Sequence, residues 1–515
     1  MSATDFSGAH LQGLSSSKIV LLKIAAMLAA VMQVLDMTIA NVALPHMQAA
    51  LGANQESVSW VLTSYIVASA IALPATGWLS NHLGRRTLFS LAIFVFMVSS
   101  VLCGIATTIE EMVIFRILQG VSGAFLSPMA QTVMFDFTPE KQRGQAMAMF
   151  GMGVMIGPIL GPILGGFLTE YLDWRWVFFV NVPIGIVALA GVAVILPELR
   201  ERSRPFDITG FILLGISLAA LQLMLDRGQH KEWFESIEIW LELLIALSAF
   251  WMFCVHIATS SNPIFHKELI ANRNLVVGSA LMIILGMILI ATMALLPIML
   301  QSLFGYPVID TGIIMASRGL GVMTTMGLAG RLAARLDIRA IISVGLLIIA
   351  ASFYEMSLWN LETSNLYFVV NGFVQGLGMG LLFVPITLMA YSTLPASLRT
   401  DGASIMNLTR SIGSSAGISF VITILSRSSS ASHEGLAAHI TPYSMYFDPS
   451  WLIRSDATQA GLTMMNMEVT RQASMIAYIN VFHILLLITI SFVPMALFIK
   501  KSKADIGRAE MSLME

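Results

Sequence analysis

The chain has too little charge to cover itself with water-facing side chains. Only 11% of its 515 residues are charged, whereas a soluble protein carries about a quarter. The sequence contains no Gly-x-x-x-x-Gly-Lys-Ser/Thr loop, which argues against ATP hydrolysis by this chain. Its two cysteines, Cys103 and Cys254, lie in apolar runs and match neither a disulfide framework nor a metal site. A net charge of -2 gives no indication of nucleic-acid binding.

Long apolar runs make up most of the sequence instead. Hydrophobic residues account for 57% of the chain, and a helix crosses the hydrocarbon of a bilayer with about 20 apolar residues. Because lipid offers no partner to backbone amides, helices are the expected spanning form. We therefore expect an all-α polytopic membrane protein with spans near 20–44, 57–80, 87–107, 111–136, 144–170, 175–196, 208–226, 237–258, 275–303, 310–333, 338–359, 365–391, 402–425 and 476–499.

Basic residues predict the orientation of these spans. Lys and Arg are concentrated in the segments before span 1, after each even-numbered span and after span 14, and they are sparse in the alternate segments. Cytoplasmic loops carry this excess of positive charge. We therefore expect both termini, 1–19 and 500–515, to be cytoplasmic. The polar residues before the first span are too many for a signal peptide, so none is expected to be cleaved.

A weak internal echo predicts a duplicated architecture. Gly77-x-Leu79 is followed by Arg86, and Gly330-x-Leu332 is followed at the same spacing by Arg339. Transporters built from two repeated halves show such echoes. We expect a six-helix bundle over 20–196, a linker with two additional spans over 197–274, and a second six-helix bundle over 275–499. The second bundle would include a long periplasmic loop over 426–475.

Glycine and proline are concentrated in span 5. Gly153, Gly157, Gly161 and Gly165 recur every four residues, so they line one face of the helix and allow close approach of another helix. Pro158 and Pro162 each remove a backbone hydrogen bond and bend the helix. A close-packed, bendable seam is typical of a helix that must rock or slide.

Two charged residues lie inside apolar spans near the start of the chain. Asp36 lies in span 1 within Leu35-Asp36-Met37-Thr38, five residues before Asn41, and Arg116 lies in span 4 three residues before Gln119. Charges within a membrane are costly and usually functional. Asp36 is a candidate proton carrier, but it would also suit a cationic substrate or a structural pair with Arg116 or Asn41.

These motifs resemble those of the major facilitator superfamily. The segment Gly77 to Thr87, with Gly84, Arg85 and Arg86, resembles the loop between spans 2 and 3 of that superfamily. The family usually has Asp where this chain has Asn81. Because Asn carries no charge, we expect weaker stabilisation of the outward-facing state by this residue. Further matching segments are Arg116-x-x-Gln119-Gly120, the Gly-x-x-x-Gly-Pro pattern of span 5, Leu35 to Pro45 and Trp174 to Gly185.

Taken together, the motifs resemble the fourteen-span drug:proton antiporters of the EmrB/QacA group. The resemblance implies the major facilitator fold and export of hydrophobic or amphipathic toxic compounds in exchange for protons, with no other cofactor. It assigns Arg116 to proton coupling. It also implies small hydrophobic substrates, an inner-membrane location, and partnership with a periplasmic membrane-fusion protein and an outer-membrane channel. The loop 426–475 would dock such a partner, act as a lid, or merely connect two spans.

Other polar residues within the spans are further candidates. Arg318 and Arg410 are expected to face the central cavity or a carboxylate, and Asp226 and Glu355 are either proton acceptors at the outer gate or exposed helix-end acids. Two rival functions fit the same motifs: a dedicated exporter of an endogenous metabolite, lipid or siderophore, and a transport-inactive sensor or scaffold. Retained intramembrane charges argue against the second. No cluster of catalytic or metal-ligating residues indicates an enzyme.

Overall fold

The computed structural model describes residues 15–198, 205–333, 335–440 and 458–499, and these residues form α-helices and short 3-10 turns without a strand. Fourteen of the helices are long and apolar enough to cross a membrane. The predicted spans are therefore confirmed, and their bounds are α2 (Ser16–Ala50), α3 (Gln55–Ala72) continued through η1 (Leu73–Ala75) into α4 (Thr76–Leu83), α5 (Arg85–Ile105), α6 (Ile109–Asp136), α7 (Arg143–Tyr171), α8 (Trp176–Phe179) with α9 (Asn181–Ile195), α10 (Ile208–Arg227), α11 (Ile237–Thr259), α13 (Arg273–Ser302), α14 (Val308–Leu332), α15 (Ile338–Met356), α16 (Asn365–Ser392), α17 (Arg399–His439) and α19 (Thr458–Phe492).

Local sequence sets where several of these helices begin and end. Asn54, Thr108 and Asn272 each precede a helix, and their side chains accept a hydrogen bond from a backbone amide in its first turn. Such caps satisfy amides that have no partner within the helix. Gly84 separates α4 from α5 with a φ of 94°, a conformation that glycine adopts without steric cost. The tight turn expected at this position is therefore present.

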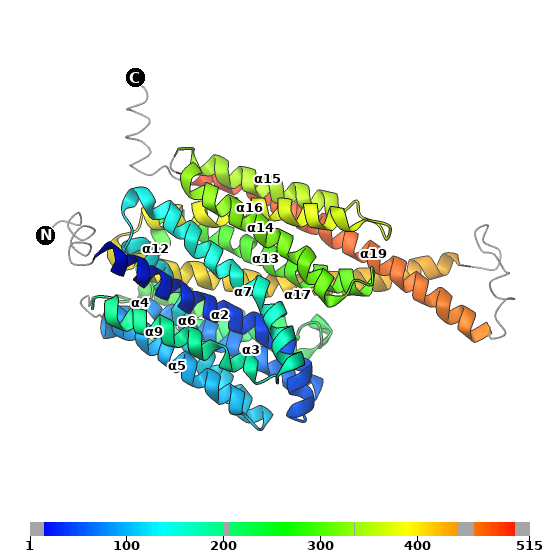
Figure 1. Ribbon diagram of the computed structural model, residues 1–515, viewed down its shortest axis with the longest axis horizontal. Coiled ribbons are helices and arrows are strands. Elements are labelled where there is room, and N and C mark those ends of the chain that lie inside the picture. Colours follow the sequence, from blue (N-terminus) through cyan, green and yellow to red (C-terminus); the bar gives the residue numbers. More distant parts are fainter. Residues whose placement is uncertain (1–14, 199–204, 334, 441–457, 500–515) are drawn as a thin grey trace, which may run out of the picture.

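The helices are arranged in two groups that follow the order of the chain. In Figure 1, α2 to α6 and α9 lie together along one side, α13 to α19 lie along the other, and α7 lies between these two groups. The start of α2 and the end of α19 lie at the same end of the bundle (Figure 1). At the contact between the groups, the backbones of Gly144 in α7 and Gly330 in α14 touch closely.

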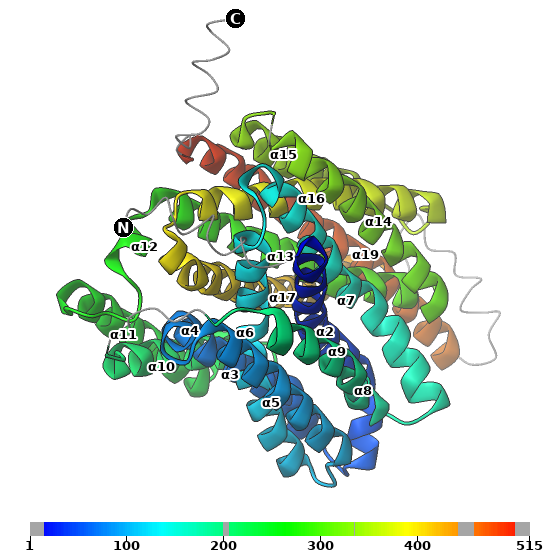
Figure 2. The same ribbon diagram turned by 60° about the vertical axis from the view of Figure 1, so that its left-hand side comes forward.

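The two additional helices pack against both groups. Figure 2 shows α10 beside α3, with α11 on the outer side of α10. Ser217 of α10 donates a hydrogen bond to the carbonyl of Ala246 in α11 (2.9 Å). Ser419 of α17 donates to the carbonyl of Leu225 in α10 (2.6 Å), and Trp233 donates to Thr423 of α17 (2.8 Å). The inserted pair thus touches the first group through α3 and the second through α17.

The segment 426–475, predicted to be a loop, is helical over most of its described length. Helix α17 continues to His439 and α19 begins at Thr458, so the two helices project beyond the rest of the bundle (Figure 1). The prediction of a loop was wrong here because the apolar signal ends where lipid contact ends, whereas helical backbone hydrogen bonds continue into a polar stretch. Tyr443, Tyr446, Phe447 and Trp451 lie outside the described residues.

Candidate functional site

Asp36 is fully buried and is held by three side chains from two other helices. Arg116 Nη1 donates to its Oδ2 atom at 2.6 Å, and the two form a salt bridge with no solvent exposure on either side. Its Oδ1 atom accepts hydrogen bonds from Gln119 (2.9 Å) and Asn181 (2.8 Å). The carboxylate therefore ties α2 to α6 and α9 at one point.

Arg116 is positioned by contacts of its own. Its Nε atom donates to the carbonyl of Val61 in α3 (2.8 Å), and Nη1 also reaches Gln119 Oε1 (2.8 Å). The guanidinium lies over the ring of Tyr65, 4.4 Å from its centroid, an arrangement that stabilises a cation. These contacts hold the buried arginine from α3 as well as from α6.

The two charges in this cluster compensate each other, which limits what it can bind. A cationic substrate would have to displace Arg116 from a short, buried ion pair. A proton needs no displacement, because it adds to a carboxylate oxygen. Neutralising Asp36 would leave the Arg116 charge buried without a counter-ion, which costs several kcal/mol in proteins. The charge of Asp36 and the packing of α2 against α6 and α9 therefore depend on the same contacts.

The glycine face of α7 packs against α2, the helix that carries Asp36. A methyl group built on Gly157 would lie 2.9 Å from Val34 and 3.0 Å from the amide of Leu35, and at Gly161 it would meet Thr38. The Thr38 hydroxyl also lies 3.2 Å from the carbonyl of Gly157. The predicted seam is thus formed, with Gly153 and Gly165 against α2 as well and with Pro158 and Pro162 inside the helix.

A second charged group joins the two halves at the end of the bundle where α2 begins. Asp136, the last residue of α6, accepts hydrogen bonds from Arg85 (2.7 Å) and from Arg399 at the start of α17 (2.5 Å). We call these three residues the latch. The ring of Phe135 packs under the Arg399 guanidinium, 4.9 Å from its centroid. The latch connects the first half to the second through one carboxylate.

The predicted motif residues surround this latch. Gly77 packs against the Asp401 side chain of α17, where a larger residue would collide with it. Asn81 is half-buried and Arg86 is exposed. Arg85 also donates to the carbonyl of Ala396 in the second half (3.4 Å). Position 81 carries no charge in this chain, and Asp136 forms an ion pair with Arg399 that crosses between the halves.

Arg318 and Arg410 do not join the Asp36 cluster, and neither has a carboxylate partner within the described part of the chain. Arg318 donates one hydrogen bond, from Nη1 to Thr292 in α13 (2.7 Å). Arg410 makes a long contact with Asn407 (3.4 Å). Of the two predicted surroundings, a carboxylate or the central cavity, the carboxylate is not found for either arginine in these described residues, and the cavity stays a prediction for both.

The remaining candidates lie apart from one another. Asp226 is exposed, and its carboxylate contacts the hydroxyl of Thr63 in α3. Glu355 is half-buried and accepts a hydrogen bond from Asn371 (2.8 Å). Asn41 is exposed, a little more than one turn beyond Asp36. Asp226 and Glu355 are thus bonded to neighbouring helices, whereas Asn41 lies outside the cluster.

Three residues at these sites, Asn181, Asp136 and Arg399, have no role predicted from the sequence. Asn181 completes the shell around Asp36, and its amide also donates to Ser100 (3.0 Å). It lies in the Trp174 to Gly185 segment, so the motif itself was a signal. Asp136 and Arg399, two residues of the latch, pair across 263 residues of sequence. No local sequence pattern predicts such a pairing.

Comparisons with known proteins agree with this architecture. The family model of the Major Facilitator Superfamily matches residues 26–418. The chain is 33% identical over 432 residues to the multidrug export protein EmrB of Haemophilus influenzae, covering 82% of this chain and 84% of that protein. It is also 33% identical over 422 residues to the fatty acid resistance protein FarB of Neisseria gonorrhoeae, covering 81% and 83%.

Solved structures show the same fold at low sequence identity. The proton:xylose symporter XylE superposes with a TM-score of 0.60 at 15% identity, covering 93% of this chain and 97% of that one. The human organic anion transporter MFSD10 superposes with a TM-score of 0.58 at 15% identity, covering 92% and 99%. The chain belongs to the major facilitator superfamily of membrane transporters, in the fourteen-span group that includes the EmrB export proteins.

Proposed function

We propose that this protein is a proton-driven exporter of hydrophobic and amphipathic toxic compounds, working by alternating access in the inner membrane with both termini cytoplasmic. Protons are the coupling ion in this proposal. Names of relatives, including multidrug export and fatty acid resistance proteins, support export. Lys and Arg are concentrated in the segments that follow the even-numbered spans, which lie on the same side as the termini, and this supports the orientation.

The buried Asp36 cluster is the observation that carries the coupling. One carboxylate accepts from Arg116, Gln119 and Asn181, which lie in two other helices, and α2 itself lies on the glycine seam of α7. A proton on Asp36 removes the charge that holds these helices together. Proton binding and movement of α2 along the seam are thereby linked, as antiport requires.

Inverted membrane vesicles that contain the protein test this proposal. The vesicles are energised until their interior is acidic, and lipophilic compounds of either charge are added while a fluorescent pH probe is followed. We expect dequenching on addition of a substrate, lost in Asp36→Asn at equal expression. Asp173→Asn, at an exposed residue paired with Arg175, is the matched control. Normal exchange by Asp36→Asn would overturn the proposal.

We further propose that the protein is the inner-membrane permease of a tripartite export system. The projecting part of α19 carries exposed apolar side chains at Leu462 (54%), Met464 (64%) and Met467 (66%). Apolar side chains gathered on a segment beyond the lipid favour contact with a partner protein. A periplasmic membrane-fusion protein that leads to an outer-membrane channel would fit there.

The projecting segment can be tested separately from transport itself. Met464→Gln with Met467→Gln is expected to reduce resistance of whole cells to exported compounds while leaving proton exchange in inverted vesicles intact. Unchanged resistance would argue that this segment is a connector or a lid. Loss of exchange in the vesicles would instead assign it to the transport cycle.

A further inference from the structure

Arg318 is a buried cation with almost no partners. Its side chain is 5% exposed, and its one hydrogen bond is donated by Nη1 to Thr292. Its Nε and Nη2 atoms have no hydrogen-bond partner within the described part of the chain. Burying a guanidinium without a counter-ion is costly. An arginine left in this state has donors available for an anion that is not part of the described chain.

Equivalent positions in the two halves of the protein can be identified from glycine contacts. Gly120 of α6 packs against the carbonyl of Tyr65, and Gly376 of α16 packs in the same way against the carbonyl of Arg318. Each glycine follows a buried glutamine, Gln119 or Gln375. The Tyr65 position of the first half therefore corresponds to the Arg318 position of the second.

The corresponding sites differ in their carboxylate. In the first half, Gln119 and Arg116 both bond to Asp36, which comes from the first helix of that half. In the second half, the first helix, α13, provides only the Thr292 hydroxyl. Both amide atoms of Gln375 are buried without a partner in the described residues. The second half thus has buried donors on Arg318 and Gln375 but, among the described residues, no carboxylate that occupies the place of Asp36.

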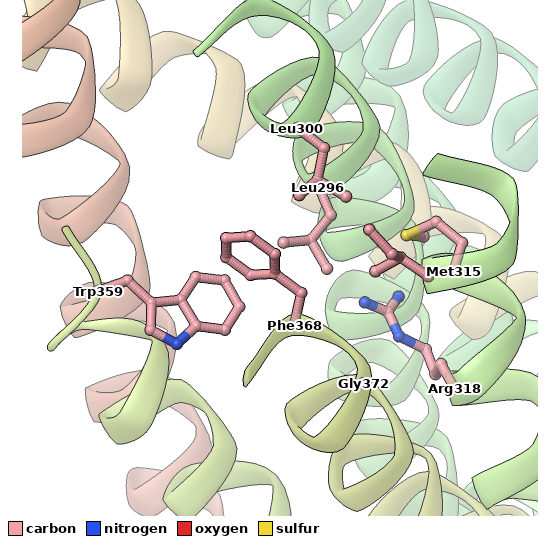
Figure 3. A pocket seen from close by; sticks show the side chains of 8 residues that line it. Leu296, Leu300, Met315, Arg318, Trp359, Phe368 and Gly372 are labelled. Carbon is pink, nitrogen blue, oxygen red and sulfur yellow. The ribbon is translucent and has the colours of Figure 1, made fainter. Parts of the chain in front are cut away.

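An apolar cavity adjoins the Arg318 guanidinium. Its walls are formed by side chains of α13, α14 and α16 and of the turn after α15, namely Leu296, Leu300, Ile314, Met315, Trp359 and Phe368. Figure 3 shows the guanidinium pointing into the space among these side chains. The cavity is about 10 Å³, about the room that one water needs. Trp359 and Phe368 meet edge to face, 4.8 Å between ring centroids, and must separate to admit a larger guest.

We propose that Arg318, held in place by Thr292, binds the anionic head of an exported amphiphile, a carboxylate with a hydrocarbon tail. The carboxylate accepts from the free guanidinium nitrogens in a paired geometry that suits arginine. Its tail lies against Leu296, Leu300 and Phe368 once the aromatic pair opens. This inference rests on the proposed export function and assigns one substrate class to a site apart from Asp36.

Binding to purified full-length protein in detergent tests the assignment. Radiolabelled dodecanoate is the probe, and its affinity is measured by scintillation proximity for the wild type, Arg318→Gln, Arg318→Lys and Arg331→Gln. We expect Arg318→Gln to bind about 10- to 100-fold more weakly, the loss of charge-assisted hydrogen bonds. Arg318→Lys should fall between. Arg331 lies on the same helix and is exposed, so Arg331→Gln should bind as the wild type does.

Competition on the wild-type protein keeps the test valid if Arg318→Gln does not fold. Unlabelled dodecanoate should displace the probe, whereas dodecanol and dodecyltrimethylammonium of the same chain length should displace it at least 10-fold less well. Equal displacement by the cation would overturn the assignment, as would unchanged binding by a folded Arg318→Gln. Displacement by acetate or chloride at equal concentration would also overturn it, in favour of a site for small inorganic or tailless anions.

Failure of the inference can be distinguished from failure of the export function. Vesicles that respond to dodecyltrimethylammonium but not to dodecanoate would overturn the Arg318 site and leave proton-driven export standing. Vesicles that respond to dodecanoate in the wild type and to the cation alone in Arg318→Gln would support both. Vesicles that respond to no compound would overturn the export function.

Discussion

Replacing Asp136 by Asn is expected to open the end of the transporter that the latch closes. The Asp136 carboxylate is 14% exposed and lies between Arg85 and Arg399, which are 9% and 14% exposed. Asparagine keeps the size of the side chain but removes the charge. Two guanidinium groups would then face each other, partly buried, without a shared counter-ion.

The magnitude follows from the burial of the three side chains. Removing one partner of a fully buried ion pair costs about 3–5 kcal/mol, and exposed pairs contribute about 0–1 kcal/mol. For this partly exposed pair of bonds, about 2–3 kcal/mol is a reasonable value between the two limits. Arg85 lies in the same half as Asp136, so only the share that involves Arg399, about half of this energy, requires the halves to be closed at this end. The ratio of closed to open molecules should therefore fall about 5- to 13-fold.

Distances between spin labels across the two halves measure this change. Gln142 and Leu336 are exposed at the same end of the bundle, one in each half, and Cys254→Ser removes the exposed native thiol. Double electron–electron resonance should show a longer distance population in Asp136→Asn. Glu140→Gln, at an exposed residue close to the latch, should leave the distances unchanged. An unchanged distribution in Asp136→Asn would refute the role of the latch.

Two further substitutions test the site and its supporting seam. Gly157→Ala should destabilise the protein by about 1–3 kcal/mol, because its methyl group would lie 2.9 Å from Val34. Gly166→Ala, where a methyl group has open space, should not destabilise it. Thermal melting of both purified variants measures the difference, and equal melting temperatures would contradict the close packing at Gly157. Asn181→Ala removes one donor to Asp36 and should slow proton exchange about 10-fold, the value of one charge-assisted hydrogen bond. Wild-type rates in Asn181→Ala vesicles would show that this donor is dispensable.

Membrane physics explains why the spans were predictable. An apolar run of spanning length has no stable alternative to a helix in lipid, so all fourteen runs became helices. The last part of α17 and the first part of α19 were not predictable in the same way. Serine-rich residues after position 426 have no apolar signal, and their helical state depends on contact between the two helices, such as Asn480 with Ser428 (2.8 Å).

The candidate site was predictable where a single residue is energetically costly to place inside a membrane. Asp36 and Arg116 are charges in apolar runs, which is rare enough to mark them, and they do pair. Asn181 carries no charge and starts a helix, so only its motif marked it. The latch and the Arg318 cavity depend on which helices become neighbours. That information lies in tertiary packing, and one sequence read along its length does not contain it.

Proton release on substrate binding tests the coupling most directly. Purified protein in weakly buffered detergent solution is mixed with a compound that dissipates the proton gradient in vesicles, and a pH-sensitive dye reports the protons set free. If Asp36 holds the coupled proton, the wild type will acidify the solution on substrate addition and Asp36→Asn will not, although it still binds the compound. Equal proton release by Asp36→Asn and the wild type would contradict the assignment of Asp36 as the proton carrier.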